Sequence, residues 1–347
     1  MSRLSTSLPV LTIGRLRQHR QRHQRRIGGM QCVLLCVLLL AGLALGTLQL
    51  DLTQIWQALW RQGSPVFQTV IWQWRLPRLL MAITVGLALA IAGGVFQSLL
   101  RNPMGSPDVI GFNTGAWSGV LLTVVVWQGN ELAMALGALL GGTLTALLIF
   151  ALAWQRGLSR LRLIIIGIAV SALLNALNIW LMMSTTLDSA MTAVQWSVGS
   201  LNGMTWQKYL PVAAGILPCL LLCLLGTRPL QQIALGDDTA SATGVPVHRV
   251  RLLLMLAATA LTAIATAMTG PIPFIALAAP PITARLLGHP SPSLPHIGLT
   301  GALLVLAADL LAQHLLPGIQ LPVGVISITL GGFYLLYLLI TEVRTSS

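Results

Sequence analysis

Asp309 is the one acidic or basic residue inside the long apolar stretches that make up most of this 347-residue sequence. An ionisable side chain at membrane depth is a functional candidate by default, and a carboxylate there could bind a proton or a sodium ion. Ion-coupled carriers usually gather several acidic or carbonyl ligands at broken helices, and Asp309 stands alone. We therefore expect a structural hydrogen bond near the outer end of its segment, with Gln313 or His314, and keep an ion-coupled secondary transporter as the alternative class.

The residues that catalysis, ATP binding or metal binding would need are missing from the sequence pattern. Aspartyl proteolysis needs two acids, and serine catalysis needs a His or Lys at membrane depth. The single lysine, Lys208, is not part of a Gly-Lys-Ser/Thr loop, so the chain cannot bind ATP by a Walker A motif. The cysteines form two i, i+4 pairs without an accompanying His or acid (Cys32 with Cys36, Cys219 with Cys223), which favours lipid- or core-facing residues over a metal site. No catalytic residue is expected.

One polar stripe could line a path. Ser171, Asn175 and Asn178 are spaced i, i+4, i+7, so they share one helix face, which Met182 extends. Within a membrane such a stripe faces either a neighbouring helix or a water-filled cavity. The residues alone leave both interpretations open.

Composition indicates the environment of these residues. Apolar residues make up 55% of the chain and charged residues 8%, too few to cover the surface of a soluble domain of this length. The net charge of +12 does not indicate nucleic-acid binding, because the arginines gather in a basic tail, residues 1–28, and at the ends of apolar segments.

We predict an all-α polytopic membrane protein in which residues 29–345 form one domain of about ten transmembrane helices. The spans are expected near residues 32–50, 79–100, 109–127, 132–154, 163–183, 209–226, 252–268, 272–284, 297–313 and 321–340. The eighth is short and rich in proline, which predicts a broken or partly buried helix. Placing both termini in the cytoplasm leaves only Arg61, Arg75, Arg78 and Lys208 of the 20 basic residues outside.

A polar insert, residues 226–251, separates the sixth and seventh spans. Gly236 breaks its first apolar run, and Asp237 is a suitable N-cap for a short helix. Gly244 fits a position with positive φ, and Pro246 fits the start of a second helix. A connector could be much shorter, so we interpret the insert as a folded knob that enters a cleft in another protein, with Ala240 and Val245 exposed.

Several blocks of the sequence resemble one family. The run Leu-Gly-Asp-Asp-Thr-Ala-Ser-Ala-Thr-Gly-Val at residues 235–245 resembles the coupling loop of iron-siderophore and vitamin B12 ABC importer permeases. Arg75-Leu76-Pro77-Arg78 resembles the family's Arg-x-Pro-Arg, and Gln97 with Asn102-Pro103-Met104 its Gln-x-x-x-x-Asn-Pro block. Residues 270–277 and 321–325 match its C-terminal signatures, so the resemblance covers roughly residues 30–341.

The resemblance implies a bacterial inner-membrane permease that works with a dimer of cytoplasmic ATPases, a second permease subunit and a periplasmic siderophore-binding protein. ATP and Mg would be bound by the ATPase, and this chain would carry no cofactor. The implied residues are, for ATPase coupling, Leu235, Gly236, Asp237, Ala240, Gly244, Val245 and Arg249; for binding-protein docking, Arg75 and Arg78; for the translocation path, Ser171, Asn175, Asn178 and Ser327.

The chain departs from the family pattern at several positions. Thr243 stands where leucine is usual, Pro281 where histidine is usual, and Ala284 and Gln313 where arginine is usual. These departures look like the ferric-catecholate, enterobactin-type branch, which commonly pairs two non-identical permeases. Another iron complex, haem or cobalamin remains the alternative substrate.

Overall fold

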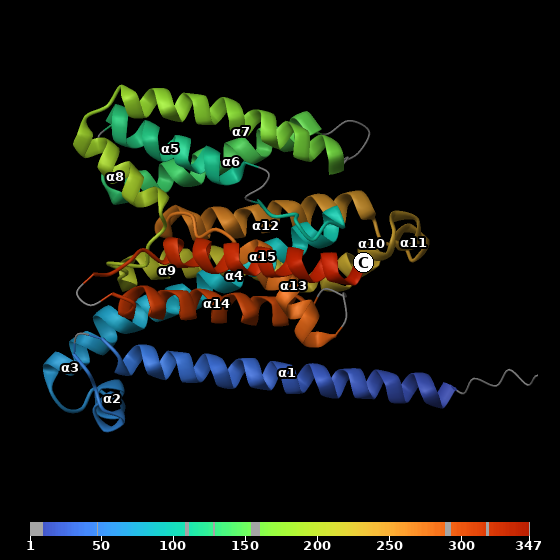
Figure 1. Cartoon of the computed structure of the whole chain (residues 1–347), viewed down its shortest axis with the longest axis horizontal. Coiled ribbons are helices and arrows are strands. Elements are labelled where there is room, and N and C mark those ends of the chain that lie inside the picture. Colours follow the sequence, from blue (N-terminus) through green and yellow to red (C-terminus); the bar gives the residue numbers. More distant parts are fainter. Residues whose placement is uncertain are drawn as a thin grey trace, which may run out of the picture.

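The computed structural model of the protein describes residues 10–46, 48–107, 111–127, 129–153, 160–288, 293–316 and 319–346. Every regular element within these residues is a helix, in agreement with the predicted class. The long helices run nearly side by side along the longest axis of the molecule (Figure 1).

The predicted spans each fall on one apolar helix. In chain order these are α1 (Val10–Ala44), α4 (Leu76–Leu100), α5 (Phe112–Trp127), α6 (Glu131–Ala153), α7 (Arg160–Met183), α9 (Trp206–Leu225), α12 (Val247–Thr269), α13 (Ile275–Leu287), α14 (Leu294–His314) and α15 (Val323–Ser346). By length and composition, 7 apolar segments in the described residues can cross a membrane, and the apolar parts of α5, α13 and α15 are shorter. The chain is thus a multi-pass membrane protein, whereas the count of ten spans stays a prediction.

Shorter helices lie at the two ends of the bundle. At one end are α2 (Leu52–Leu59), α3 (Pro65–Thr69), a π-helical turn η1 (Val70–Arg75) that leads into α4, and α8 (Leu187–Ser197). At the other end α10 (Thr227–Leu235) and α11 (Asp237–Ala242) project from the bundle (Figure 1).

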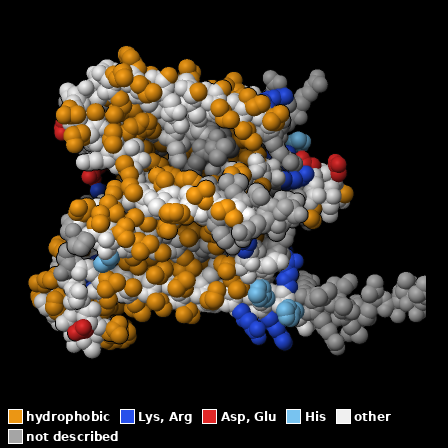
Figure 2. Space-filling model, in the orientation of Figure 1, with side chains coloured by type: hydrophobic (Ala, Val, Ile, Leu, Met, Phe, Trp, Pro, Cys, Tyr) orange, Lys and Arg blue, Asp and Glu red, His pale blue; other side chains and the backbone are white. Residues whose placement is uncertain are grey.

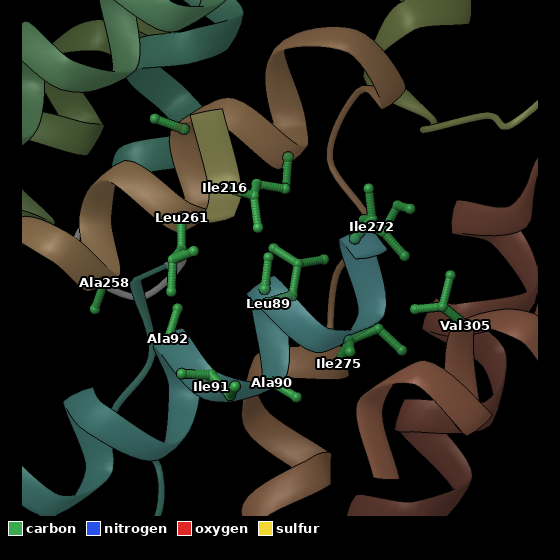
Figure 3. Close-up of a cluster of buried hydrophobic side chains, with 14 of the residues drawn as sticks. Leu89, Ala90, Ile91, Ala92, Ile216, Ala258, Leu261, Ile272, Ile275 and Val305 are labelled. Atoms are coloured by element: carbon green, nitrogen blue, oxygen red, sulfur yellow. The ribbon is translucent and has the colours of Figure 1, made fainter. Parts of the chain in front are cut away.

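The central helix is α4, which packs against α14, α12, α13 and α9. Glycines allow this close packing, since a Cβ at Gly86 would press on the backbone of Gly301 and a Cβ at Gly93 would overlap the carbonyl oxygen of Ala276. Residues 89–92 of α4 meet buried side chains of α9, α12 and α14 (Figure 3).

A second close pair is formed by α5 and α6. Gly137 and Gly141, in Gly-x-x-x-Gly spacing, let these two helices approach closely, because a Cβ at either position would press on the backbone of Gly119 or Gly115 in α5. Gly42 and Gly46 have the same spacing, but only Gly42 packs within α1, against Leu79, because Gly46 lies beyond the end of that helix.

Two segments differ in local structure from the pattern in the sequence. Residues 10–28 of the predicted basic tail are helical and continuous with the first apolar helix, and the domain boundary after residue 28 stays a prediction. After Gly244 the chain enters α12 directly, with Pro246 as its N-cap, so the helix that follows this glycine is the start of a long helix and not a second short one. In α12 no glycine or proline follows Pro246 within the helix, whereas α1 stays helical through Gly28 and Gly29.

Candidate functional site

The polar insert folds into two short helices that meet at Gly236. This residue has φ 146° and ψ 146°, a conformation that only glycine adopts readily, and it turns the chain sharply between α10 and α11. The buried side chains of α10, Leu230 and Ile233, hold that helix against the bundle. We call α10, α11 and the turn through Gly244 the coupling element.

Asp237 joins the coupling element to two long helices. Its carboxylate accepts a hydrogen bond from Arg101 at 2.6 Å and two from Arg251, both at 2.9 Å. Arg101 ends α4 in a left-handed conformation (φ 46°, ψ 42°) and also donates to the carbonyl oxygen of Ile233. Movement of α11 is therefore linked to the end of α4 and to the start of α12 through charge-assisted hydrogen bonds.

The predicted role of Asp237 as an N-cap is wrong, because Gly236 occupies that position and the carboxylate points to the two arginines. The signal that sequence reasoning missed is the pair of cations, Arg101 at the end of α4 and Arg251 near the start of α12. Nothing in their spacing from Asp237 shows that they converge. The tertiary fold brings α4 beside α10 and α12.

The exposed surface of the coupling element also differs from expectation. Ala240 is fully buried and Val245 half-buried, so neither is the exposed apolar tip that was predicted. Leu235 instead has 78% of its surface exposed. Gly244 has φ +81° as predicted, and a Cβ there would meet open space. Arg249 is exposed one turn into α12.

Beside the coupling element a cavity of about 350 Å³ opens between α4, α10, α13 and α14. The wall of this cavity contains residues that are far apart in the sequence. They are Gln97, Asn102 and Pro103 of the block that resembles the family, and Pro281 and Ala284, two of the positions that depart from the family pattern.

Gln97 has a clear structural task in this wall. Pro280 and Pro281 lie inside α13 and have no N–H, so the carbonyl groups of Ala276 and Leu277, four residues earlier, lose their helical partners. The side-chain amide of Gln97 donates to both carbonyls, at 3.5 and 3.1 Å. The glutamine of α4 thus allows α13 to remain helical through two prolines.

At the opposite end, Asp309 is completely buried in α14. Arg78 forms a two-pronged pair with it, with Nε 3.0 Å from Oδ2 and an η nitrogen 2.9 Å from Oδ1, and Gln313 donates to Oδ2 at 2.8 Å. The expected hydrogen bond with Gln313 is confirmed. His314 instead contacts the carbonyl oxygen of Leu310.

These contacts change the interpretation of the two arginines predicted to dock a binding protein. Arg78 faces inward, with 14% of its side chain exposed, because the buried carboxylate requires a counter-charge. Arg75 is half-buried and donates to the carbonyl oxygens of Leu43 and Leu48, just where α1 ends. Both guanidinium groups therefore have partners within the chain, and their docking role stays a prediction.

The residues predicted to line a path do not share one environment. Asn178 is buried against α5 and donates to the carbonyl oxygen of Thr114, the helix-to-helix contact that the sequence left open as an alternative. Asn175 is exposed and Ser171 half-buried. Ser327 is buried and donates to the carbonyl oxygen of Gly324 in its own helix. Of these four residues, Asn175 is the most exposed on the surface of this single chain.

No group of three or more His, Cys, Asp or Glu side chains is placed to hold a metal ion within the part of the chain that the structure describes. All four cysteines are free thiols. The candidate site is therefore described by the coupling element and the two arginines that bind Asp237.

Comparison with known proteins shows the family of the chain. The FecCD transport family matches residues 34–341. The chain is 51% identical, over 87% of its length and 92% of the relative's, to the ferric enterobactin transport system permease protein FepG of Escherichia coli (strain K12). It is 33% identical, over 88% and 94% of the two lengths, to the iron(3+)-hydroxamate import system permease protein FhuG of Bacillus subtilis (strain 168).

A solved structure shares the fold. An inward-facing metal-chelate type ABC transporter superposes with a TM-score of 0.81 at 29% identity, covering 92% of this chain and 99% of that one. The family match spans nearly all of the chain except the basic residues before position 34. The chain therefore belongs to the FecCD transport family.

Proposed function

We propose that this chain is a permease subunit of an ABC importer that moves a ferric siderophore of the catecholate type across a bacterial inner membrane. The observation that carries the substrate class is the 51% identity with the E. coli ferric enterobactin permease, against 33% with the hydroxamate permease. Energy would come from a separate ATPase dimer that binds ATP and Mg, since the single lysine is not part of a phosphate-binding loop.

The coupling element supports the role of the ATPase as partner. It projects from one end of the bundle, presents the 78% exposed Leu235, and is tied by Asp237 to α4 and α12. A force applied to α11 would reach two helices of the core directly. We infer that Leu235, Gly236, Asp237, Ala240, Gly244, Val245 and Arg249 form or support the docking surface, with Ala240 acting by packing.

The placement of charge supports an orientation with both termini in the cytoplasm. Lys and Arg side chains gather at the end of the molecule where α10, α11 and the N-terminal part of α1 lie, while the face between the ends is largely apolar (Figure 2). The positive-inside rule assigns that end to the cytoplasm. All ten apolar helices would then cross the membrane, and Arg75 and Arg78 would lie on the periplasmic side, where the siderophore-binding protein docks.

The full importer requires a second, non-identical permease. A path for a bulky complex would form between the two subunits, with Asn175 as the polar residue that this chain contributes from the surface of α7. Ser171, Asn178 and Ser327 would support the path from behind. An ion-coupled secondary transporter is less well supported, because the carboxylate of Asp309 is already paired with Arg78 and Gln313.

Radioactive-iron uptake by cells that lack this chain tests the proposal. Iron is supplied as catecholate, hydroxamate and citrate complexes, with labelled cobalamin as a fourth substrate. Loss of catecholate uptake alone, restored by the wild-type chain, is the expected result. Loss of uptake of a different substrate would retain the assignment as an importer permease and change the proposed substrate to another iron complex or cobalamin. Normal uptake of all four overturns the proposal.

A further inference from the structure

The face of α1 that points away from the bundle carries exposed apolar side chains at helical spacing. Val33, Val37 and Leu40 are exposed by 65%, 54% and 47% of their surfaces. The opposite face packs on the bundle, where Gln31 donates to the hydroxyl of Thr300 at 2.9 Å. The three exposed residues therefore face the lipid chains.

Two arginines continue the same stripe beyond the apolar part. Arg22 and Arg26 precede Val33 and Val37 by 11 residues each, close to three full turns, so all four lie on one side of the helix. Both arginines are exposed, as is Arg25 beside them. The positive-inside rule accounts for basic residues at this end, but it does not account for their placement on the lipid side of the helix.

The bundle holds this part of α1 at a fixed rotation. His296 Nε2 lies 3.1 Å from the carbonyl oxygen of Gln24, and His23 Nε2 lies 3.3 Å from that of Leu286. A Cβ at Gly28 would come within 3.2 Å of the His296 ring. The face with Gln24, Gly28 and Gln31 is therefore turned inward, and Arg22 and Arg26 are turned outward.

The outward arginines have no anion within reach in the sequence around them. The first acidic residue of the chain is Asp51, at the far end of α1. Three cations within five residues repel one another, and an external anion beside them would reduce this repulsion.

Distance places that anion in the membrane surface. At 1.5 Å per residue, Arg26 lies about 6 Å and Arg22 about 12 Å beyond Met30, the first exposed apolar residue of the stripe. The headgroup layer extends roughly 5–8 Å beyond the hydrocarbon core on each side. Long arginine side chains reach back toward it while the lipid's acyl chains meet Val33 and Val37.

We propose that Arg22, Arg25 and Arg26 bind the phosphate headgroups of anionic lipids in the cytoplasmic leaflet, and that this contact holds α1 against the bundle. The inference rests on the proposed orientation, with the N-terminus inside. Only 17% of the apolar segment of α1 is buried, the same share as in α7 and α9 and far below the 61% of α14, against which α1 packs, so protein contacts alone attach α1 less firmly than the central helices.

The test compares lipid binding by the purified full-length chain and its variants, using native mass spectrometry with phosphatidylglycerol and, separately, phosphatidylcholine. A basic residue near an anionic surface increases binding roughly fivefold. We expect Arg26→Gln to lower the affinity for phosphatidylglycerol by about that factor and R22Q/R26Q by about 25-fold, without changing binding of phosphatidylcholine. Arg20→Gln is the matched control, since Arg20 shares the helix face of Gln24 and Gln31.

Equal losses for R26Q and R20Q would overturn the proposal, because only net charge would then matter. Displacement of phosphatidylglycerol by inorganic phosphate at constant ionic strength would also overturn it in favour of a free-anion site. If R22Q/R26Q instead released the ATPase subunit from the complex with lipid binding intact, the stripe would be a protein contact. A reporter fused to the N-terminus that is active only outside the cell would overturn the orientation, whereas a cytoplasmic reporter with unchanged lipid binding would overturn this inference alone.

Discussion

Removing the positive charge of Arg78 tests whether it serves the fold or the docking of a binding protein. The substitution Arg78→Leu leaves the carboxylate of Asp309 completely buried, with Gln313 as its remaining hydrogen-bond donor among the residues that the structure describes. Asp309→Leu leaves the guanidinium, of which 14% is exposed, without its carboxylate. Each single variant creates an uncompensated charge.

Breaking a buried ion pair from one side costs about 3–5 kcal/mol, because the remaining charge keeps its desolvation penalty. Replacing both partners by apolar side chains removes that penalty, so R78L/D309L should lie within about 1 kcal/mol of the wild-type chain. The coupling energy from the double-mutant cycle should therefore exceed about 3 kcal/mol, whereas an exposed pair would give 1 kcal/mol or less.

The assay is reversible unfolding of the purified chain by SDS in mixed micelles, with helicity as the signal. Affinity for the periplasmic binding protein is measured on the same samples after correction for the folded fraction. We expect R78L/D309L to bind as tightly as the wild-type chain. A coupling energy below 1 kcal/mol would refute the buried-pair argument, and a weaker binding-protein affinity for the folded double variant would support the predicted docking role of Arg78.

Three further predictions concern the coupling element and α13. Asp237→Asn removes the charge shared with Arg101 and Arg251; because the carboxylate is 47% exposed, the loss of stability should be only about 1 kcal/mol, yet uptake should fall, and unchanged uptake would separate these anchors from coupling. Gly244→Arg places a bulky residue at φ +81° on an exposed turn, so we expect membrane insertion to persist and uptake to be lost, and normal transport would remove this turn from the docking surface. Gln97→Leu leaves two carbonyl groups of α13 without their donor and should lower the unfolding free energy by about 1–3 kcal/mol. Gln97→Glu should have the same effect, because an ionised carboxylate cannot donate a hydrogen bond. Wild-type stability in both variants would contradict the role of the amide.

The helices and the class of the protein follow from the sequence because they depend on local properties. Apolar segments of membrane length, separated by polar residues, predict helices whatever their neighbours are, and each predicted span falls on one. Gly244 could be assigned positive φ, because the turn needs a residue without a Cβ. The family blocks were equally readable, since they are continuous in the sequence.

The partners of single polar residues were decided by the tertiary structure. Asp237 looked like an N-cap and Asp309 like a lone acid, until the packing of α4 against α12 and α14 brought Arg101, Arg251 and Arg78 to them. Such pairs join residues up to 231 positions apart, and no local pattern encodes which cation meets which carboxylate. In a low-dielectric interior a buried charge must find its counter-charge, so the sequence alone required that partners exist, and only the fold could determine which residues they are.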